Sequence, residues 1–489
     1  MDQRTLVRAT LALLLAGGLT AGCTGSGRGG AVEGRPGAAG LRDPYFPKSG
    51  NGGYDVRHYA LTLDYEPSTG RLRGTAEITA RATQALSAFN LDLLGMDVQG
   101  ATVDGEEAAV HRAGQELTLR PGGGDLEKGA TFRTVVRYSG TPLTVTDPDG
   151  SKEGWLKTAD GVLALGQPTG SMAWFPGNHH PSDKASYTVA ITVPEGLQAL
   201  SNGELTEQRT RNGRTTFAWS SSEPMASYLA TLAIGRYDIR TSRTPSGLPV
   251  RTAVDTTVTR DADTSGRTDT SQDTDGTSQD TEEGATALIG RIPELLAWET
   301  ENFGPYPFSS TGAIVDRKGD VAYALETQTM PVFPGDAFDT PTLVHELAHQ
   351  WYGNSVTPET WRDMWLNEGF ATYAEWLYGE DFEETPAQER FDTAFADKEN
   401  WRFAPAEPPS AEEISDPLLY DRGAMVLHKV RQAVGDDAFH RVLQGWPATY
   451  RHSNASTEDF TRYVEAETGK DLTDLWDTWL YGTDRPSRP

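Results

Sequence analysis

Two histidines and a glutamate stand together in the stretch VHELAHQWYGN, residues 344 to 354, of a chain that has nine histidines in all. His345 and His349 are four residues apart, so on a helix they share one face, with Cβ atoms about 5 to 6 Å apart. Both rings can then bind one metal ion, while Glu346 can reach a water molecule beside it. The spacing is that of a hydrolytic zinc site, although a surface helix with two solvated histidines would also show it.

The flanking residues predict that this stretch is helical. Asp339 or Thr340 suits the N-cap, Pro341 suits the first turn, and Gly353 suits the end of the helix. The apolar residues of the segment are Leu343, Val344, Leu347, Ala348 and Trp351.

A third ligand is predicted in the stretch WLNEGFATYAEWLYGE, residues 365 to 380, where Asn367 reads as an N-cap and Gly379 as a stop signal. Glu368 follows nineteen positions after His349 (349 to 368), enough for a loop to return the chain to the same point. Two imidazoles and one carboxylate, with a fourth position open for water, form a hydrolytic zinc site. Because the chain has one cysteine, sites built from several thiolates are excluded. We therefore expect one Zn²⁺ per chain.

Several ordered motifs resemble the gluzincin zinc aminopeptidases of the aminopeptidase N and leukotriene hydrolase type. Besides HELAHQWYGN and WLNEGFATYAEW, these are FGPYPFSS at 303 to 310, YALETQTMP at 323 to 331 and LYDRGAMVLHKVR at 419 to 431. Two more lie at 166 to 194 and at 223 to 238. The resemblance extends from about residue 45 onward and implies a β saddle domain followed by a thermolysin-like catalytic domain.

The resemblance implies that Glu326 binds the free amino terminus of a peptide at the edge of a small sheet. A peptide α-amino group titrates at about 7.7 to 8.0 and is largely cationic at neutral pH, so a partly buried carboxylate would select chain ends. Tyr323, Leu325 and Thr327 depart from the usual family residues and leave the preferred first residue open. The alternative is that Glu326 is a solvated loop charge.

Three further roles follow from the same resemblance. Glu346 would act as general base and pass the proton of water to the leaving amine. Tyr420, just ahead of a helix, would donate to the oxyanion, unless it is only a packed tyrosine. Gln167 would lie beside the substrate amine, where a neutral amide attracts an ammonium more weakly than Glu326 does.

The segment NHHPSD carries His179 where the family pattern leads us to expect an acid. His179 and His180 could suggest a second metal site. Adjacent side chains point to opposite faces of a strand, however, which favours packing or surface roles.

The length of 489 residues suits two folded units. From 45 to 253, two-residue alternation predicts a mostly antiparallel β domain, which the resemblance makes the N-terminal β saddle. From 285 to 489 the spacing becomes helical, as expected for the thermolysin-like zinc peptidase domain, so the fold class is β followed by α+β. The alternating residues are Tyr59, Leu61, Leu63, Tyr65, Tyr187, Val189, Ile191 and Val193. The large helical domain that closes the site in many relatives would have no room after Pro489.

The segment from 254 to 284 is almost free of apolar residues and rich in Asp, Thr, Ser and Gly. It cannot bury enough surface to offset the entropy cost of ordering, so we expect a disordered insertion. Its aspartates match no calcium-loop spacing, which favours a solvated linker.

The first residues indicate export. Arg4 and Arg8 precede the apolar run at 11 to 19, which is too short to span a bilayer and suits a secretory signal. The run ends in LTAGC, and this resembles a bacterial lipoprotein signal over 1 to 23, with Cys23 acylated and 24 to 44 as a flexible tether. Ordinary cleavage would give a secreted protein instead. We expect an exported protein, either anchored in the membrane at the cell surface or secreted.

The formal net charge of -27 argues against nucleic acid as a partner. We expect a zinc-dependent aminopeptidase that acts on peptides with a free N-terminus. A zinc endopeptidase of the thermolysin kind would share the ligands but have no use for Glu326. A catalytically dead, lipid-anchored binding protein on the same fold would be expected to have lost Glu346 or a ligand. The oligomeric state is left open.

Overall fold

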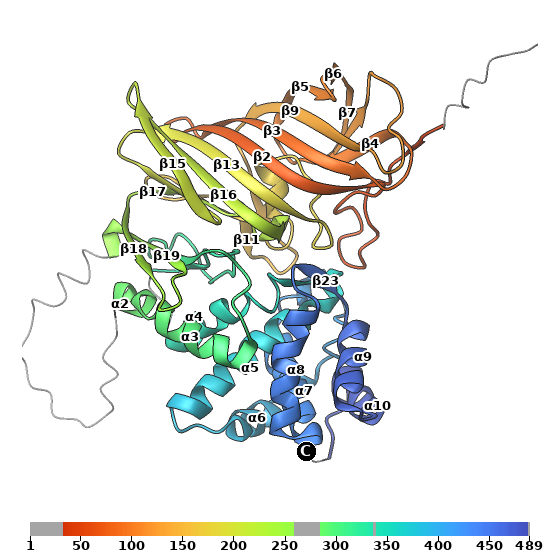
Figure 1. The fold of residues 1–489 in the computed structure, drawn as a ribbon, viewed down its shortest axis with the longest axis vertical. Coiled ribbons are helices and arrows are strands. Elements are labelled where there is room, and N and C mark those ends of the chain that lie inside the picture. Colours follow the sequence, from red (N-terminus) through yellow and green to blue (C-terminus); the bar gives the residue numbers. More distant parts are fainter. Residues whose placement is uncertain (1–32, 259–283, 336–338, 488–489) are drawn as a thin grey trace, which may run out of the picture.

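The computed structural model describes residues 33–258, 284–335 and 339–487. A unit made of β-sheets packs on a unit made mostly of helices, shown at the top and the bottom of Figure 1. The predicted class, a β-rich N-terminal domain followed by an α+β catalytic domain, is confirmed.

The N-terminal unit is built around an eight-stranded sheet in the order β15-β16-β13-β2-β3-β9-β5-β6. Alternate side chains of β2 and β13 are buried, as the two-residue spacing predicts, and these two strands pair in parallel with Tyr187 opposite Tyr59. The other pairings in this sheet are antiparallel. The strands are β2 (Tyr54–Glu66), β3 (Arg71–Ala82), β5 (Asp97–Val103), β6 (Glu106–Glu107), β9 (Thr131–Gly140), β13 (Lys184–Pro194), β15 (Glu204–Arg211) and β16 (Arg214–Ala226).

Two smaller sheets complete the N-terminal unit. One has the order β1-β4-β8-β7 and the other the order β10-β11-β12-β17-β14. The first contains β1 (Arg35–Pro36), β4 (Leu86–Asp92), β7 (Ala109–Ala113) and β8 (Glu116–Arg120). The second contains β10 (Thr144–Thr146), β11 (Lys152–Lys157), β12 (Val162–Leu165), β14 (Gln198–Ser201) and β17 (Leu232–Gly235).

The domain boundary predicted at 253 is wrong. The strands β18 (Tyr237–Arg243) and β19 (Pro249–Asp255) join β20 (Thr311–Val315) and β21 (Val332–Phe333) in a separate sheet, with β19 parallel to β20. The second unit therefore begins between β17 and β18. Alternation along the chain does not reveal this change, because it shows which face of a strand is buried but not which strand it pairs with. The insertion predicted at 254 to 284 begins later, since β19 continues to Asp255, and 259–283 lies outside the described residues.

The flexible tether predicted at 24 to 44 is also wrong where the structure describes it. Arg35 and Pro36 pair with β4, and the buried Asp43 accepts hydrogen bonds from the backbone N–H of Phe46 and of Trp361. Glycine serves close packing here, since a Cβ at Gly37 would lie 2.5 Å from a backbone carbonyl oxygen. Residues 1–32, which carry the predicted signal and Cys23, lie outside the described ranges.

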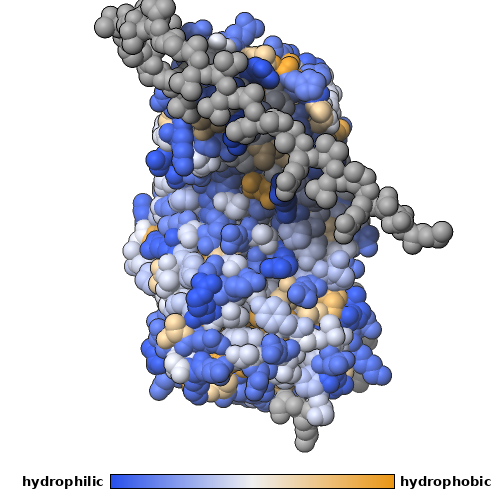
Figure 2. All heavy atoms as spheres, turned by 90° about the vertical axis from the view of Figure 1, so that its right-hand side faces the viewer, coloured by the Kyte–Doolittle hydropathy of each residue, from blue (hydrophilic) through white to orange (hydrophobic). Residues whose placement is uncertain are grey.

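The second unit is mainly helical. Its helices are α2 (Ala285–Gly290), α3 (Ile292–Phe303), α4 (Thr340–Ala348), α5 (Trp365–Phe382), α6 (Ala387–Ala396), α7 (Pro417–Val434), α8 (Asp436–Thr449), α9 (Thr457–Thr468) and α10 (Thr473–Leu475). A short parallel ladder joins β22 (Val356–Pro358) and β23 (Ser453–Ala455). No helix in the described ranges has a stretch both long and apolar enough to cross a membrane. The face in Figure 2 is mostly hydrophilic, in keeping with the high net charge.

Candidate active site

The first two predicted ligands lie at the end of α4. Asp339 caps this helix, because its side chain accepts a hydrogen bond from the N–H of Thr342 at 2.9 Å. Of the two predicted N-caps, Asp339 and Thr340, the first is therefore the cap. The helix stops at Ala348 and His349 is its C-cap, so it does not extend to Gly353. Gly353, at a φ of 122°, belongs to the turn that follows. His345 and His349 still face the same point, with ring centroids 4.7 Å apart.

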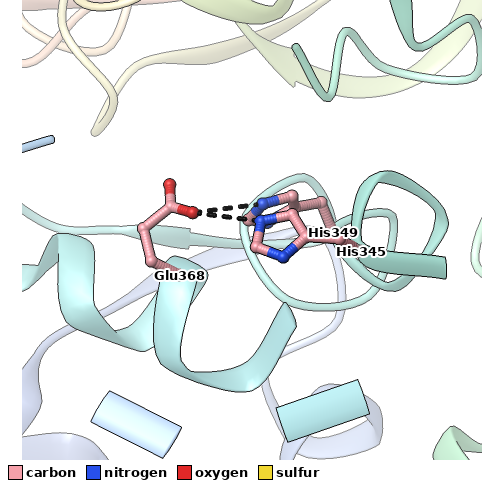
Figure 3. Close-up of side chains that lie close together, drawn as sticks. All are labelled: His345, His349 and Glu368. Atoms are coloured by element: carbon pink, nitrogen blue, oxygen red, sulfur yellow. Dashed lines mark hydrogen bonds and ion pairs between the residues drawn. The ribbon is translucent and has the colours of Figure 1, made fainter. Parts of the chain in front are cut away.

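Glu368 reaches this point from α5. Its Oε2 lies 3.3 Å from Nε2 of His345 and 3.4 Å from Nε2 of His349 (Figure 3). The predicted cap Asn367 is inside the helix, because α5 directly continues a 3-10 turn (Trp361–Met364) that begins at a capping box between Thr360 and Asp363. Gly379 is likewise inside α5.

A close contact between glycines holds α5 against α7. A Cβ built on Gly369 would lie 2.7 Å from the Cα of Gly423, so a larger residue would push the helices apart. Gly369 follows Glu368 directly, and Gly423 lies one turn after Tyr420 on α7. The tight contact therefore fixes the place of both functional side chains.

The donor set fits zinc. The three ligand atoms lie within 4.8 Å of one another, and all three residues are buried. The second ring nitrogen of each histidine has an acceptor, since Nδ1 of His345 donates to Glu375 Oε1 at 2.6 Å and Nδ1 of His349 to the carbonyl of Tyr352 at 3.0 Å. When the rings are neutral, each Nε2 directs its lone pair at the shared point, which is the tautomer that zinc requires. These residues form the predicted zinc site.

The ligands stabilise one another's charges. Burial opposes the charged form of Glu368, but His349 and His345 lower its pKa to about 2. Burial also opposes the charged form of His349, whereas Glu368 and Glu326 raise its pKa to about 9. Hydrogen bonds to Glu368 and Glu375 likewise raise the pKa of His345 well above its usual range, against the effect of burial. A metal ion that replaced the two imidazole protons would take over their place as the positive charge opposite Glu368.

Glu346 lines the same pocket as the ligands. Burial raises the pKa of its carboxyl group to about 8, and its Oε2 is buried without a hydrogen-bond partner among the described residues. A carboxyl group with a pKa near neutrality can both take up and release a proton, which is what a general acid–base needs. Its position is the one that the sequence predicts for the base.

Glu326 also lines the pocket, on the segment before β21. Leu325 exchanges two backbone hydrogen bonds with Val332 of β21, which places this segment at the edge of the small sheet. The carbonyl of Glu326 accepts from Asn354 Nδ2 at 2.6 Å, which ties the segment to the turn after α4. The side chain is 3% exposed, its Oε1 has no partner among the described residues, and burial raises its pKa. The alternative of a solvated loop charge is therefore wrong.

Tyr420 and Gln167 complete the predicted set. Tyr420 lies in the first turn of α7 rather than ahead of it, because Pro417 starts the helix and Asp416 caps it. Its ring stacks on that of His345 with centroids 5.7 Å apart and planes at 15°. Gln167, between β12 and the following turn, lines the pocket, and its Oε1 is buried without a partner among the described residues. The structure thus brings all seven predicted residues into one pocket of about 260 Å³.

His179 has a structural role, because its ring is buried and hydrogen-bonded to neighbouring residues. Its Nε2 donates to the carbonyl of Phe175 and its Nδ1 contacts the hydroxyl of Ser227, each at 3.0 Å. Burial lowers its pKa to about 4, so the ring is neutral. His180 contacts Asp43 and Ser182 instead. Packing, rather than a second metal site, accounts for both histidines.

Sequence reasoning missed two groups of residues at the site. Glu375 follows Glu368 by seven positions on α5. This spacing of about two helical turns places both side chains on one face of the helix, and it was the signal in the sequence that could have revealed Glu375. Asp147 and Asp149 line the pocket from the turn between β10 and β11. Their local sequence, DPDG, signals only a turn.

Comparisons with known proteins agree with this arrangement. Residues 339–479 match the model of the peptidase family M1 domain, and residues 161–229 match that of the peptidase M1 N-terminal domain. Aminopeptidase M1-B of Oryza sativa subsp. japonica is 28% identical over 320 residues, which are 62% of this chain and 35% of that protein. The leucyl aminopeptidase of Saccharolobus solfataricus is 23% identical over 450 residues, which are 87% of this chain and 53% of that protein. The chain thus spans about a third to a half of the length of these curated relatives.

Solved structures cover more of both chains. The M1 zinc metallopeptidase of Deinococcus radiodurans is 30% identical, with a TM-score of 0.80 over 92% of this chain and 98% of that one. A mutant of that enzyme, solved with a Tyr-Ser-Ala substrate, matches with a TM-score of 0.79 over 92% of this chain and 99% of that one. With this likeness over nearly both whole chains, and with the zinc ligands in place, the chain belongs to peptidase family M1.

Proposed function

We propose that this protein is a zinc-dependent aminopeptidase, which removes residues from the amino end of peptides. The observation that carries the proposal is Glu326, a buried carboxylate with an unpartnered oxygen in the same pocket as His345, His349 and Glu368. An unpaired buried carboxylate is costly, and the α-ammonium of a peptide supplies both the missing charge and the missing donors.

Each residue of the pocket has its own role in the proposed hydrolysis. His345, His349 and Glu368 would hold a zinc ion, which would lower the pKa of a water molecule to about 7 and polarise the peptide carbonyl. Glu346 takes the proton of the attacking water and delivers it to the leaving amine. The hydroxyl of Tyr420 donates to the carbonyl oxygen as negative charge develops there. Glu326 and Gln167 hold the amino end, so that the first peptide bond lies at the reacting position.

Blocking the amino terminus of the substrate tests this function. We expect hydrolysis of aminoacyl fluorophores, loss of activity with a chelator and recovery with added zinc, and no hydrolysis of the N-acetylated forms. An acetylated substrate leaves Glu326 buried without its cation, which costs about 2 to 5 kcal/mol. The kcat/KM of the free substrate should therefore exceed that of its N-acetylated form by about thirtyfold or more.

Two other outcomes would identify the two alternatives. An endopeptidase of the thermolysin kind would cleave the acetylated and free forms alike, and a dead binding protein would cleave neither.

The variant Glu326→Gln should lower kcat/KM for free substrates, whereas the matched control Glu301→Gln, at an exposed position on α3, should not. Equal loss in both variants would contradict the role of Glu326.

We further propose that the protein is exported and anchored in the membrane through an acylated Cys23, or secreted if it is cleaved by ordinary signal peptidase. The support is the sequence alone: two arginines, a short apolar run, and LTAGC with the single cysteine. Labelling cells with a radioactive fatty acid tests it. The full-length protein should be labelled and found in membranes, and Cys23→Ser should not be labelled. Wild-type protein that stays unlabelled in the medium would point to simple secretion.

A further inference from the structure

The pocket contains carboxylates that the reaction does not use. Asp147 and Asp149, on the turn between β10 and β11, line the same pocket as Glu326 and the metal ligands. The hydroxyl of Tyr323 donates to the carbonyl of Lys152 at 2.8 Å. This bond joins the start of β11 to the segment that carries Glu326. The acidic turn therefore lies beside the group that would hold the amino end.

The turn is held in place by its own hydrogen bonds. Asp149 Oδ1 accepts from the N–H of Ser151 at 2.9 Å and from its hydroxyl at 2.7 Å. Glu153, at the base of the turn, is fully buried and accepts from the N–H and hydroxyl of Thr169, at 3.1 and 3.0 Å. Asp147 is buried as well, at 7% exposed. These bonds hold the turn between β10 and β11 in place.

The pocket offers these carboxylates no cation of its own. Among the described residues that line it there is neither Lys nor Arg, and its two histidines are the zinc ligands. Lys152, at the start of β11, is exposed and directs its ammonium to the hydroxyl of Thr146 at 2.5 Å. After Glu326 has bound the α-ammonium and Glu346 has bound water, the charge of Asp147 and Asp149 remains for a further group of the substrate.

The unpartnered acceptors that would hold the amino end lie in the same pocket as the acidic turn. Gln167 Oε1 and Glu326 Oε1 are buried in this pocket with no partner among the described residues. The side chain of Glu326 is more than nine-tenths buried. Apolar surface from Leu325 and Ile414 also lines the pocket and suits a methylene stem.

We propose that Asp147 and Asp149 form a subsite for a basic side chain, so that the enzyme prefers peptides whose first residue is arginine or lysine. This rests on the proposed aminopeptidase function, because only a bound amino end brings the first side chain to this turn. A guanidinium offers five donors in a fixed fork and matches carboxylates well, while an ammonium offers a compact charge. A neutral side chain of the same shape would leave both carboxylates without a cation.

Matched substrate pairs test the charge: citrulline keeps the shape of arginine without its charge, and norleucine keeps the four-carbon stem of lysine without its ammonium. Arginyl and citrullinyl fluorophores form one pair, and lysyl and norleucyl fluorophores the other, assayed with the zinc-loaded full chain. Hydrogen bonds to charged groups contribute about 1.5 to 3 kcal/mol. We therefore expect kcat/KM to favour the charged member of each pair by about ten- to a hundredfold.

Variants locate the effect. Asp147→Asn should reduce the ratio of kcat/KM for the arginyl substrate to kcat/KM for the citrullinyl substrate by about tenfold. Asp149→Asn should reduce it less, because Asp149 is exposed and solvent screens its charge. Asp97→Asn, an exposed control on β5 that does not line the pocket, should leave the ratio unchanged. If Asp147→Asn does not fold, the test rests on Asp149→Asn and the wild-type ratios.

The outcomes separate this inference from the proposed function. If no free aminoacyl substrate is hydrolysed, the aminopeptidase proposal fails. If free substrates are hydrolysed but citrulline and norleucine equal or exceed their charged partners, the function stands and the basic subsite is refuted. A preference for glutamyl or aspartyl substrates that grows with added calcium would also refute it, since a cation would then occupy the carboxylates.

Discussion

Glu375 accepts a hydrogen bond from Nδ1 of His345 at 2.6 Å, two helical turns after Glu368 on the same helix. One helix therefore supplies both a ligand and the group that orients another ligand. The bond fixes the tautomer of His345 and makes its Nε2 a better donor to the metal.

Removing this carboxylate should weaken metal binding. We expect Glu375→Ala to lower zinc affinity by about ten- to a hundredfold, measured by competition with a chelator. Glu375→Gln keeps an acceptor without the charge and should fall between wild type and alanine. Glu383→Gln, at the exposed end of α5, serves as control. Unchanged zinc affinity in Glu375→Ala would show that the hydrogen bond does not support the site.

Glu346→Gln should separate metal binding from turnover. The amide keeps the shape of the side chain but cannot take a proton, so kcat should fall by about a hundred- to ten-thousandfold. Zinc content, measured by atomic absorption, should stay at one ion per chain. A variant that turned over at the wild-type rate would refute the assigned base.

Tyr420→Phe removes only the hydroxyl that faces the developing charge. The loss of one such donor costs about a hundred- to a thousandfold in kcat. KM should change little, because the ground-state carbonyl accepts more weakly than the transition state. If thermal stability falls instead while kcat is kept, Tyr420 is only a packing residue.

Gly369→Ala should disturb the contact between α5 and α7. The added methyl would lie 2.7 Å from the Cα of Gly423, and relieving such overlap costs about 1 to 3 kcal/mol. We expect a lower midpoint of thermal unfolding and, because Glu368 adjoins this position, weaker zinc binding. Gly290→Ala, in α2 where no atom lies within 4 Å of the new Cβ, is the matched control. Equal midpoints for both variants would contradict the tight contact.

His179 should make the fold less stable in acid. Burial lowers its pKa to about 4 in the folded chain, whereas the unfolded chain keeps about 6.5. The unfolded state therefore binds more protons between these values, and the free energy of unfolding falls as pH drops through this range, by up to about 3 kcal/mol. Replacement by glutamine should flatten this part of the curve. Parallel curves for wild type and His179→Gln would show that another group controls acid unfolding.

The spacing of residues within one segment was enough to predict much of the site. His345, Glu346 and His349 take their relative positions from helix geometry, which depends on the local backbone alone. The alternation in β2 and β13 likewise predicted which side chains are buried, because the faces of a strand alternate whatever its partners are. The family resemblance added Glu326, Gln167 and Tyr420, which lie on separate segments.

The contacts between distant segments were decided by tertiary packing. The close approach of Gly369 and Gly423 sets where Tyr420 stands over His345, and hydrogen bonds across the chain hold Glu326 in the pocket. The N-terminal segment that composition marked as a tether instead packs around Asp43, and β18 and β19 pair with strands of the second unit. Asp147 and Asp149 enter the pocket on a turn whose following strand, β11, is bonded to Tyr323 at Lys152. Such pairings depend on shape and hydrogen bonding between surfaces far apart in sequence, and no local periodicity records them.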